Sequence, residues 1–329
     1  MRVAVIGTGF GRRVVAPTYR ATEGCEVVEV VTARDDDAVR VAISRSDVDL
    51  VSVHSPPYLH AAHVRAALAS GKAVLCDKPF ALDAREAAAL EAEAAQAGVV
   101  ALCNFEFRYA PARVRLREIV RDGVLGRVEH VQWIHVSSGS RVPMRPWGWL
   151  FDRSLGGGWI GAWASHAVDQ LRHGLSTEIT HARATLRTDV PMRPDEEGAL
   201  HRCTAEDGLT AGLVLADDAT AAIDSTFAAT VHSAPRLTLF GSEAVVDVVN
   251  DERIVTRRSN GEREKVDIGA GEASDRHFEP MRRFAAVVRD AVHSGEIPAG
   301  APTFSDGRAC DAVLDRLRAE PFATDVASD

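Results

Sequence analysis

The chain has 329 residues, of which 46% are hydrophobic and 26% are charged, and its formal net charge is −9 with an isoelectric point near 5.8. This composition is typical of a globular protein with a sizeable core, and the length suggests about two domains. The acidic balance argues against nucleic acid or an anionic membrane as the main partner.

Export and membrane segments are not apparent in the sequence. No apolar run approaches the roughly 20 residues needed to cross a bilayer, and the opening MRVAVIG enters a strand-like segment directly, without the apolar region of a secretory signal. The five cysteines are scattered, odd in number and without a C-x-x-C spacing. We therefore expect a reduced, cytoplasmic protein with no metal site.

The first 125 residues alternate between strand-like and helix-like segments. The strand-like runs are short and rich in β-branched residues, which is typical of a sheet buried on both faces; they cover residues 3–6, 27–31, 50–54, 73–76 and 99–103. The clearest helical pattern starts at Asp83 with Glu86 in a capping-box-like arrangement and should end at Gly98. This alternation predicts an α/β domain over residues 1–125, a Rossmann-type doubly wound parallel sheet.

The pattern changes after residue 125. Several runs between residues 128 and 240 read as successive strands separated by turn residues, with Asp217 and Asp218 in one hairpin turn, and helical patterns follow at 278–292 and 305–318. We expect an α+β domain over residues 126–329, built on a mostly antiparallel, open-faced sheet. The last residues, ATDVASD, are polar and are expected to fray.

A glycine-rich loop, VIGTGFGRR, follows the first strand and precedes a helix. Gly7 permits a sharp turn, Gly9 lets a pyrophosphate approach the backbone, and the helix N-terminus supplies N–H groups and a positive dipole end. The usual fingerprint places its third small residue where this chain has Arg12, and Gly11 stands one position early. A plain glycine turn is the alternative, but the strand-to-helix position favours dinucleotide binding.

The second strand ends in Thr32, Ala33 and Arg34, where NAD-binding proteins usually carry an acid for the ribose hydroxyls. A hydroxyl and a guanidinium would hold a 2′-phosphate, whereas a carboxylate would repel it. We therefore favour NADP over NAD, which stays possible. The alternative is that Arg34 is an ordinary solvated arginine.

Three further motifs end the following strands, at the edge where open α/β sheets bind their ligands. They are SPPYLH, CDKPF and CNFEFRYAP, and they contribute Ser55, Pro56 and His60, then Asp77 and Lys78, then Asn104 and Arg108. With the glycine loop and DGVLGRV, this ordered set of motifs resembles the Gfo/Idh/MocA oxidoreductase family, and the resemblance covers residues 2 to about 318.

The resemblance implies an oxidoreductase that interconverts a secondary alcohol and a ketone on a sugar, cyclic polyol or related ring substrate, assembled as a homodimer or homotetramer. It also implies a set of cofactor-binding residues: Gly7, Gly9, Phe10, Gly11, Thr32, Arg34, Ser55, Pro56, His60, Asp77 and Lys78. Lys78 would hydrogen-bond the reacting oxygen and transfer its proton, and Asp77 would contact the nicotinamide ribose. The cofactor would carry the hydride.

The stretch GGGWIGAWASHAVD fits the family's catalytic helix. His166 and Asp169 match two of its positions and share a helix face, so His166 is expected to share the proton transfer and Asp169 to orient the substrate or the imidazole. Arg108 and Trp163 complete the expected substrate contacts. A core helix is the alternative, and packing in the core or at a subunit interface is at least as good an explanation for any one of the five tryptophans.

Two departures from the family pattern affect these expectations. Residues 32–49 have room for one short helix only, so we expect a trimmed sheet edge without the usual third strand. Ala162 stands where the family carries an aspartate. The loss of this acid keeps a second hypothesis open, a catalytically silent cofactor-binding sensor; a lyase or glycosidase that uses the nicotinamide transiently is a third.

Overall fold

A computed structural model describes residues 1–269, 275–319 and 322 of the chain. The chain divides into two compact units. The first contains residues 1–114, 154–156 and 275–312, and the second contains 115–153, 157–269, 313–319 and 322. No helix in these ranges is both long enough and apolar enough to span a membrane.

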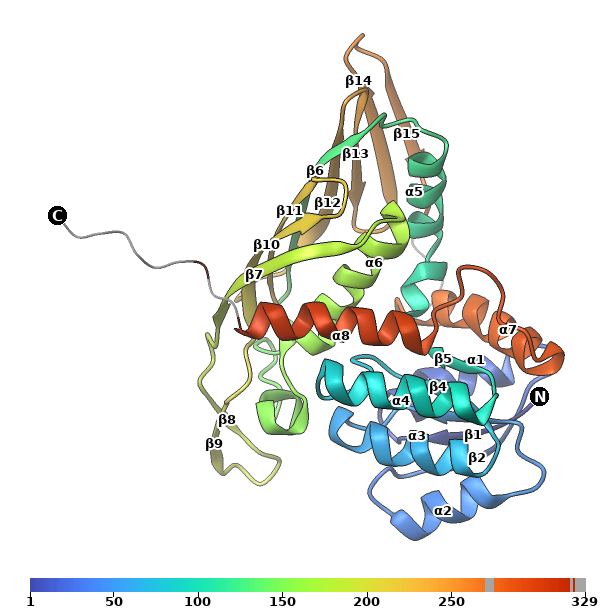
Figure 1. Cartoon of the computed structure of the whole chain (residues 1–329). Helices are drawn as coiled ribbons and strands as arrows, with labels where there is room; N and C mark the ends of the chain where they lie inside the picture. The colour runs from blue at the N-terminus through green and yellow to red at the C-terminus, as the bar shows by residue number, and fades with distance from the viewer. Residues whose placement is uncertain (270–274, 320–321, 323–329) are drawn as a thin grey trace. The chain divides into compact units, whose positions relative to one another are not determined.

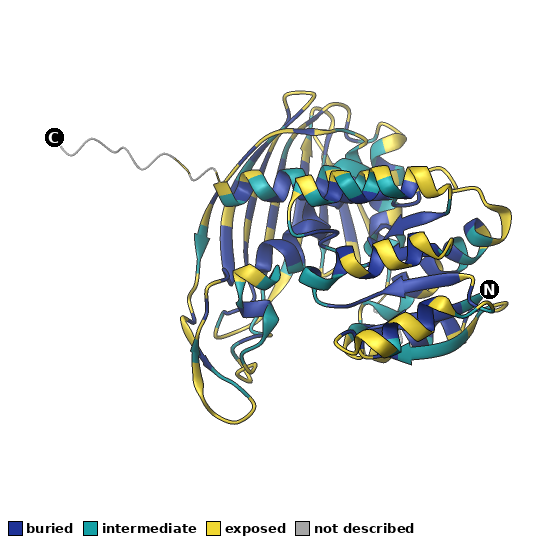
Figure 2. Cartoon of the chain, turned by 60° about the horizontal axis from the view of Figure 1, so that its bottom comes forward, coloured by how far each residue is buried: buried dark blue, intermediate teal, exposed yellow. Residues whose placement is uncertain are grey.

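The first unit is built on a five-stranded parallel sheet with the order β2-β1-β3-β4-β5 (Figure 1). Its strands are β1 (Arg2–Ile6), β2 (Glu26–Val31), β3 (Leu50–Val53), β4 (Ala73–Cys76) and β5 (Ala101–Cys103). Strands β3, β4 and β5 are buried along their whole length, and Figure 2 shows dark blue strands beside helices with yellow outer faces. The predicted Rossmann-type sheet is confirmed.

Helices cover both faces of this sheet. They are α1 (Ala16–Arg20), preceded by a π-helical turn (Gly11–Val15), α2 (Asp36–Ser44), α3 (His60–Ala69), α4 (Ala84–Ala97) and α7 (Phe278–Ser294). Helices α2, α3 and α4 pack side by side, and α1 packs with α7. The predicted caps of α4 are present: Asp83 accepts from the Glu86 N–H, and Gly98 ends the helix with φ 64°.

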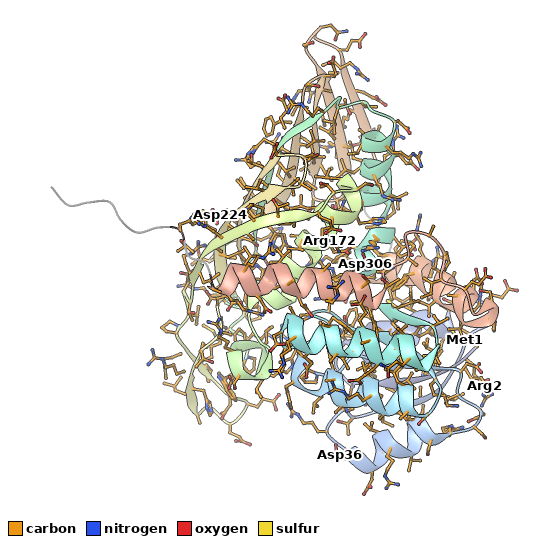
Figure 3. The ribbon with its side chains drawn as sticks, viewed as in Figure 1. Met1, Arg2, Asp36, Arg172, Asp224 and Asp306 are labelled. Atoms are coloured by element: carbon orange, nitrogen blue, oxygen red, sulfur yellow. The ribbon has the colours of Figure 1, made fainter. Side chains whose placement is uncertain are left out.

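The sheet is trimmed at β2, as residues 32–49 predict. Only α2 lies between β2 and β3, and no described strand pairs with the outer side of β2. Arg2, labelled in Figure 3, binds Glu26 of β2 and Asp47 of the loop after α2 through two salt bridges of 2.6 and 2.7 Å. Polar side chains thus occupy this end of the shortened sheet.

Helix α7, which follows the second sheet in the chain, belongs to the core of the first unit. Its buried residues Met281, Phe284 and Val288 pack in one cluster with Val3 and Leu75 of the sheet. Tyr109 stacks on Phe284 with ring centroids 4.9 Å apart. The chain therefore returns to its first unit after completing the second sheet, which a reading in chain order does not reveal.

The second unit contains an eight-stranded sheet with the order β15-β14-β13-β12-β6-β11-β10-β7. These strands are β6 (Val128–Val136), β7 (Ile179–Arg187), β10 (Gly208–Leu215), β11 (Thr220–Thr226), β12 (Ser233–Gly241), β13 (Ala244–Val249), β14 (Arg253–Arg258) and β15 (Arg263–Asp267). All neighbours pair antiparallel except β6 and β11, so the mostly antiparallel sheet is confirmed. Asp218, with φ 65°, makes the predicted hairpin turn.

The remaining elements are shorter strands and connecting helices. A two-stranded sheet is formed by β8 (Met192–Pro194) and β9 (Leu200–Arg202), and the other α-helices are α5 (Pro111–Arg121), α6 (Ser165–Leu175) and α8 (Phe304–Ala319). The 3-10 turns cover Pro57–Leu59, Glu106–Tyr109, Trp149–Phe151 and Arg153–Leu155, and a π-helical turn, Ile160–Ala164, leads into α6. The stretch GGGWIGAWASHAVD is therefore helical from Trp159 onward, and its three glycines precede the helix.

Candidate functional site

The three glycines of the loop after β1 have different surroundings. Gly7 has φ 127°, and a Cβ there would overlap the carbonyl oxygen of His54. A Cβ on Gly11 would lie 3.0 Å from Val5 and 3.2 Å from the His54 Cβ. A Cβ on Gly9 would meet no described atom within 4 Å. Packing therefore explains Gly7 and Gly11, whereas Gly9 faces open space of the kind that a pyrophosphate needs.

The departure at Arg12 also has a physical explanation. Arg12 is exposed at the start of the helical turn, so its side chain does not need to fit between helix and strand. The close helix–strand approach, which a third small residue usually permits, is made at Gly11 against Val5 instead. The packing role of the third glycine is thus filled one position earlier, at Gly11.

The end of β2 presents its polar side chains to solvent. Thr32 and Arg34 are both exposed, and Arg34 has no hydrogen bond or ion pair with the described residues. The next residue, Asp35, caps α2 by accepting from the Ala38 N–H at 3.0 Å. Arg34 is thus available to an anionic ligand, and its predicted contact with a 2′-phosphate stays a prediction.

The loop after β4 carries Asp77 and Lys78 and is fixed by residues from α8. Phe80 packs on Phe304 with ring centroids 4.3 Å apart, and Gly307 leaves room for the Phe80 ring, which a Cβ would approach to 2.8 Å. The Asp311 carboxylate accepts from the Ala81 N–H at 2.9 Å. The predicted catalytic lysine therefore follows a strand end and precedes a firmly packed turn.

Asp77 is surrounded by hydrogen-bond donors. Its Oδ1 accepts from the Lys78 N–H at 2.9 Å and from the Asn104 amide at 3.3 Å, and its Oδ2 lies 3.1 Å from the His54 Nδ1. Burial raises the pKa of Asp77, but the His54 hydrogen bond and the charges of His54, Lys78 and His60 outweigh it and lower the pKa to about 2. A carboxylate offers about four acceptor sites, so the three donors among the described residues leave one for a ligand; the predicted contact with a ribose hydroxyl stays a prediction.

Ser55 and His60 contact other protein groups. The His60 ring lies between the Ser55 carbonyl at 2.8 Å and the Pro79 carbonyl at 3.0 Å, which connects the loop after β3 to the loop after β4. The Ser55 hydroxyl lies 3.0 Å from the His63 Nδ1. Burial lowers the pKa of both histidines. Pro56 is half-buried beside them; the cofactor contacts of these residues stay predictions.

Arg108 is buried and its guanidinium is engaged. It donates to the Gly300 carbonyl at 3.1 Å and forms a 2.9 Å salt bridge with Asp306 of α8, which Figure 3 labels. These contacts give Arg108 a structural role in the first unit. Its expected role as a substrate contact stays a prediction.

In the second unit, tight packing explains two glycines of the GGG run. A Cβ on Gly157 would overlap the carbonyl oxygen of Trp149, and one on Gly158, with φ 112°, would overlap the Glu206 carboxylate. Glu206 is buried and accepts from the Ile160 N–H at 3.0 Å, and burial raises its pKa. Glu206 therefore anchors the first turn of the helical segment that carries His166.

His166 and Asp169 lie on α6 and are both buried, with 7% and 3% of their surfaces exposed. Trp163, one turn earlier, is 5% exposed and stacks on His135 with ring centroids 4.9 Å apart. It also meets Trp133 edge-on at 5.4 Å. These contacts support the core-packing interpretation of Trp163, and its predicted contact with substrate stays a prediction.

Lys78 and His166 belong to different units. Their joint action in one site is therefore a proposal. Within the first unit, the structure brings together the glycine loop, Asp77 and a residue that the sequence analysis missed, His54. The signal was a polar residue directly after a buried strand, in VSVHS. The sequence analysis also missed the pair of Glu106 and His277, which lie 2.6 Å apart. The His277 ring lies 5.2 Å from the Phe10 ring.

Comparisons with protein families cover both units. Residues 1–105 match the model described as an oxidoreductase family with an NAD-binding Rossmann fold, and residues 114–247 match that of the GFO/IDH/MocA C-terminal domain. An uncharacterized oxidoreductase of Synechocystis sp. is 31% identical over 271 residues, which are 76% of this chain and 72% of that protein. A levoglucosan dehydrogenase of Pseudarthrobacter phenanthrenivorans is 30% identical over 160 residues, 48% of this chain and 41% of its own length.

Solved structures share the fold over nearly the whole chain. A levoglucosan dehydrogenase in complex with NADH and levoglucosan has a TM-score of 0.83 at 20% identity, covering 97% of this chain and 96% of that one. A super-repressor mutant of Gal80p from Saccharomyces cerevisiae has a TM-score of 0.82 at 15% identity, covering 97% and 95%. The same architecture thus occurs in a dehydrogenase and in a repressor.

Proposed function

The chain belongs to the Gfo/Idh/MocA family of oxidoreductases, and we propose that it is an NAD(P)-dependent dehydrogenase or reductase that interconverts a secondary alcohol and a ketone on a sugar, cyclic polyol or related ring substrate. The observation that carries this proposal is the pairing of the open space at Gly9 with the ionised Asp77 and its remaining acceptor site. The cofactor supplies the hydride when bound.

The residues of the first unit hold the cofactor and one proton donor. Gly9 accommodates the pyrophosphate, and the Asp77 carboxylate accepts a hydrogen bond from the nicotinamide ribose. Lys78 Nζ hydrogen-bonds the reacting oxygen and exchanges a proton with it, a general acid–base role. The packed turn around Phe80 keeps this lysine near the ribose-binding carboxylate.

The second unit supplies the substrate-facing helix. His166 shares the proton transfer with Lys78, and Asp169, one turn later on the same helix face, orients the substrate or the imidazole. Ala162 leaves this helix without the acid that the family usually carries. We therefore assign proton handling to Lys78 and His166 alone.

We propose NADP as the preferred cofactor, with NAD as the alternative. Support comes from Thr32 and Arg34, which are exposed at the end of β2 where an acid would exclude a 2′-phosphate. NAD is the alternative because the levoglucosan dehydrogenase structures that share this fold are complexes with NADH.

A sensor without turnover is the second candidate function. It is favoured by one specific observation, the loss of the expected acid at Ala162, and the likeness to Gal80p shows that the fold occurs in a repressor. The presence of both Lys78 and His166 argues against it, because a sensor needs no pair of proton-transfer groups.

Substitution of the two proton-handling residues tests the proposal. Lys78→Ala and His166→Ala should each lower turnover by roughly 100-fold or more, the scale of a general acid–base group. Cofactor affinity, measured by titration calorimetry, should change little, since neither side chain is assigned to the pyrophosphate or adenine ribose. Near-normal turnover of His166→Ala would contradict the catalytic role of His166 and indicate that its helix is purely structural.

A further inference from the structure

His54 is a buried histidine at the junction of the glycine loop and the loop of Asp77. It follows β3, and its side chain is fully buried. The backbone of Gly7 packs against the His54 carbonyl, and Gly11 packs against its Cβ. The Phe10 ring lies 5.8 Å from the imidazole. His54 thus contacts the glycine loop through its carbonyl and Cβ, and Asp77 through its imidazole.

The hydrogen bonds of His54 define its tautomer. Asp77 is ionised and can only accept, so the His54 Nδ1, 3.1 Å from Oδ2, carries the proton and donates. In a neutral imidazole the Nε2 is then an acceptor, and the Ser52 hydroxyl, 2.7 Å away, donates to it. Ser52 is completely buried. Both ring nitrogens therefore have directional partners.

We propose that His54 is a positioning residue, which orients the Asp77 carboxylate for the nicotinamide ribose and connects it to the glycine loop. This inference rests on the proposed function, because it assumes that Asp77 contacts the cofactor. The Asp77 Oδ1 receives the Lys78 backbone N–H and the Asn104 amide, so the orientation of this carboxylate also sets the start of the Lys78 turn.

Removal of the imidazole leaves Asp77 buried with fewer donors. This carboxylate faces three hydrogen-bonding groups: the His54 imidazole, the Lys78 backbone N–H and the Asn104 amide. The side chains of Lys78 and His60 act on it through their charges. Burial, which favours the neutral carboxyl, is then less compensated, and the pKa of Asp77 rises. A protonated Asp77 has lost an acceptor site, so cofactor affinity should acquire a dependence on pH in addition to that of the wild type.

The test is the binding of oxidised NADP, measured by titration calorimetry from neutral to mildly acidic pH. The His54→Phe variant keeps a ring beside Phe10. As the pH is lowered and Asp77 takes up a proton, its NADP affinity relative to wild type should fall by roughly tenfold for each pH unit. His54→Asn places an amide nitrogen near the position of Nδ1 and should recover most of the affinity. His63→Phe removes another buried imidazole of the same unit, one that contacts Ser55, and should not introduce the pH dependence.

The outcomes separate this inference from the proposed function. A wild type that binds neither NADP nor NAD would overturn both. A wild type that binds cofactor but turns over no substrate would overturn the enzyme assignment and leave the role of His54 open to the same binding assay. If His54→Phe follows the wild-type pH profile, or His54→Asn binds as weakly as His54→Phe across the range, His54 does not position Asp77. Should His54→Phe fail to fold, the comparison of His54→Asn with His54→Gln, whose amide extends one carbon further, decides the point.

Discussion

At the residue scale, Arg34 provides the sharpest test of cofactor choice. Replacing it with aspartate exchanges a charge-assisted phosphate partner for a repelling carboxylate. Arg34→Asp should weaken NADP binding by roughly 10- to 100-fold, the range expected for a hydrogen bond to a charged group, and should leave NAD binding nearly unchanged. Titration calorimetry with both cofactors measures the difference.

A matched variant controls for the change in net charge. Arg40→Asp alters an exposed arginine on α2 that pairs with Asp37 at 2.6 Å, so it should affect neither cofactor. Equal losses of NADP and NAD affinity in Arg34→Asp would remove the basis for choosing NADP.

Single residues were predictable from the sequence where chain order determines their position. Gly9, Asp77 and Lys78 come shortly after parallel strands, in the loops at the carboxyl ends of β1 and β4. Trp163 and Arg108 were less predictable, because their surroundings come from distant segments. Trp163 stacks on His135, and Arg108 forms a salt bridge with Asp306. No local sequence pattern predicts such partners.

At the element scale, α8 determines the conformation of the Lys78 turn. A Cβ on Gly307 would lie 2.8 Å from two atoms of the Phe80 ring. Alanine in a helix gains about 1 kcal/mol over glycine, but overpacking costs about 1–3 kcal/mol, and we expect the clash to dominate. Gly307→Ala should therefore lower the free energy of unfolding, measured by urea denaturation.

A double-mutant cycle tests whether the clash with Phe80 causes the loss of stability in Gly307→Ala. Phe80→Leu reduces the ring volume opposite Gly307, so adding it to Gly307→Ala should cost less than the sum of the two single substitutions. Additive losses would show that Gly307 and Phe80 do not interact, and that the turn is held by other contacts.

The elements themselves followed from the sequence to different degrees. The absent third strand was visible because residues 32–49 hold one capped helix, α2, and nothing else. The return of α7 to the first core was not visible, because its amphipathic pattern fixes which face is buried and not against which sheet. Met281 and Phe284 meet Val3 only in three dimensions.

At the scale of the whole molecule, buried histidines should make stability fall in mild acid. Burial lowers the pKa of His63 to about 4, while the unfolded chain titrates near 6.5. The unfolded state binds the proton first, so this stability is complete above about pH 6.5 and is lost as pH falls towards 4, by about 3 kcal/mol at most. Asp77, with its pKa lowered to about 2, adds a second loss below about pH 4.

Urea denaturation at a series of pH values measures this dependence. His63→Gln should flatten the part of the curve between pH 6.5 and 4 and leave the loss below pH 4 in place. An unchanged slope in His63→Gln would mean that other groups, such as His60, carry the acid sensitivity.

The central claim, an oxidoreductase acting on ring polyols, is tested most directly by cofactor-linked turnover. The wild-type protein is incubated with NADP or NAD and a panel of sugars, anhydrosugars and cyclitols, and with the reduced cofactors and the corresponding ketones. Absorbance of the reduced nicotinamide is followed, and thermal shift reports binding in the same wells. We predict that at least one compound that stabilises the cofactor-bound protein also drives hydride transfer, faster with NADP than with NAD. Compounds that stabilise the cofactor-bound protein without any change in nicotinamide absorbance, in either direction, would contradict the claim and identify a sensor.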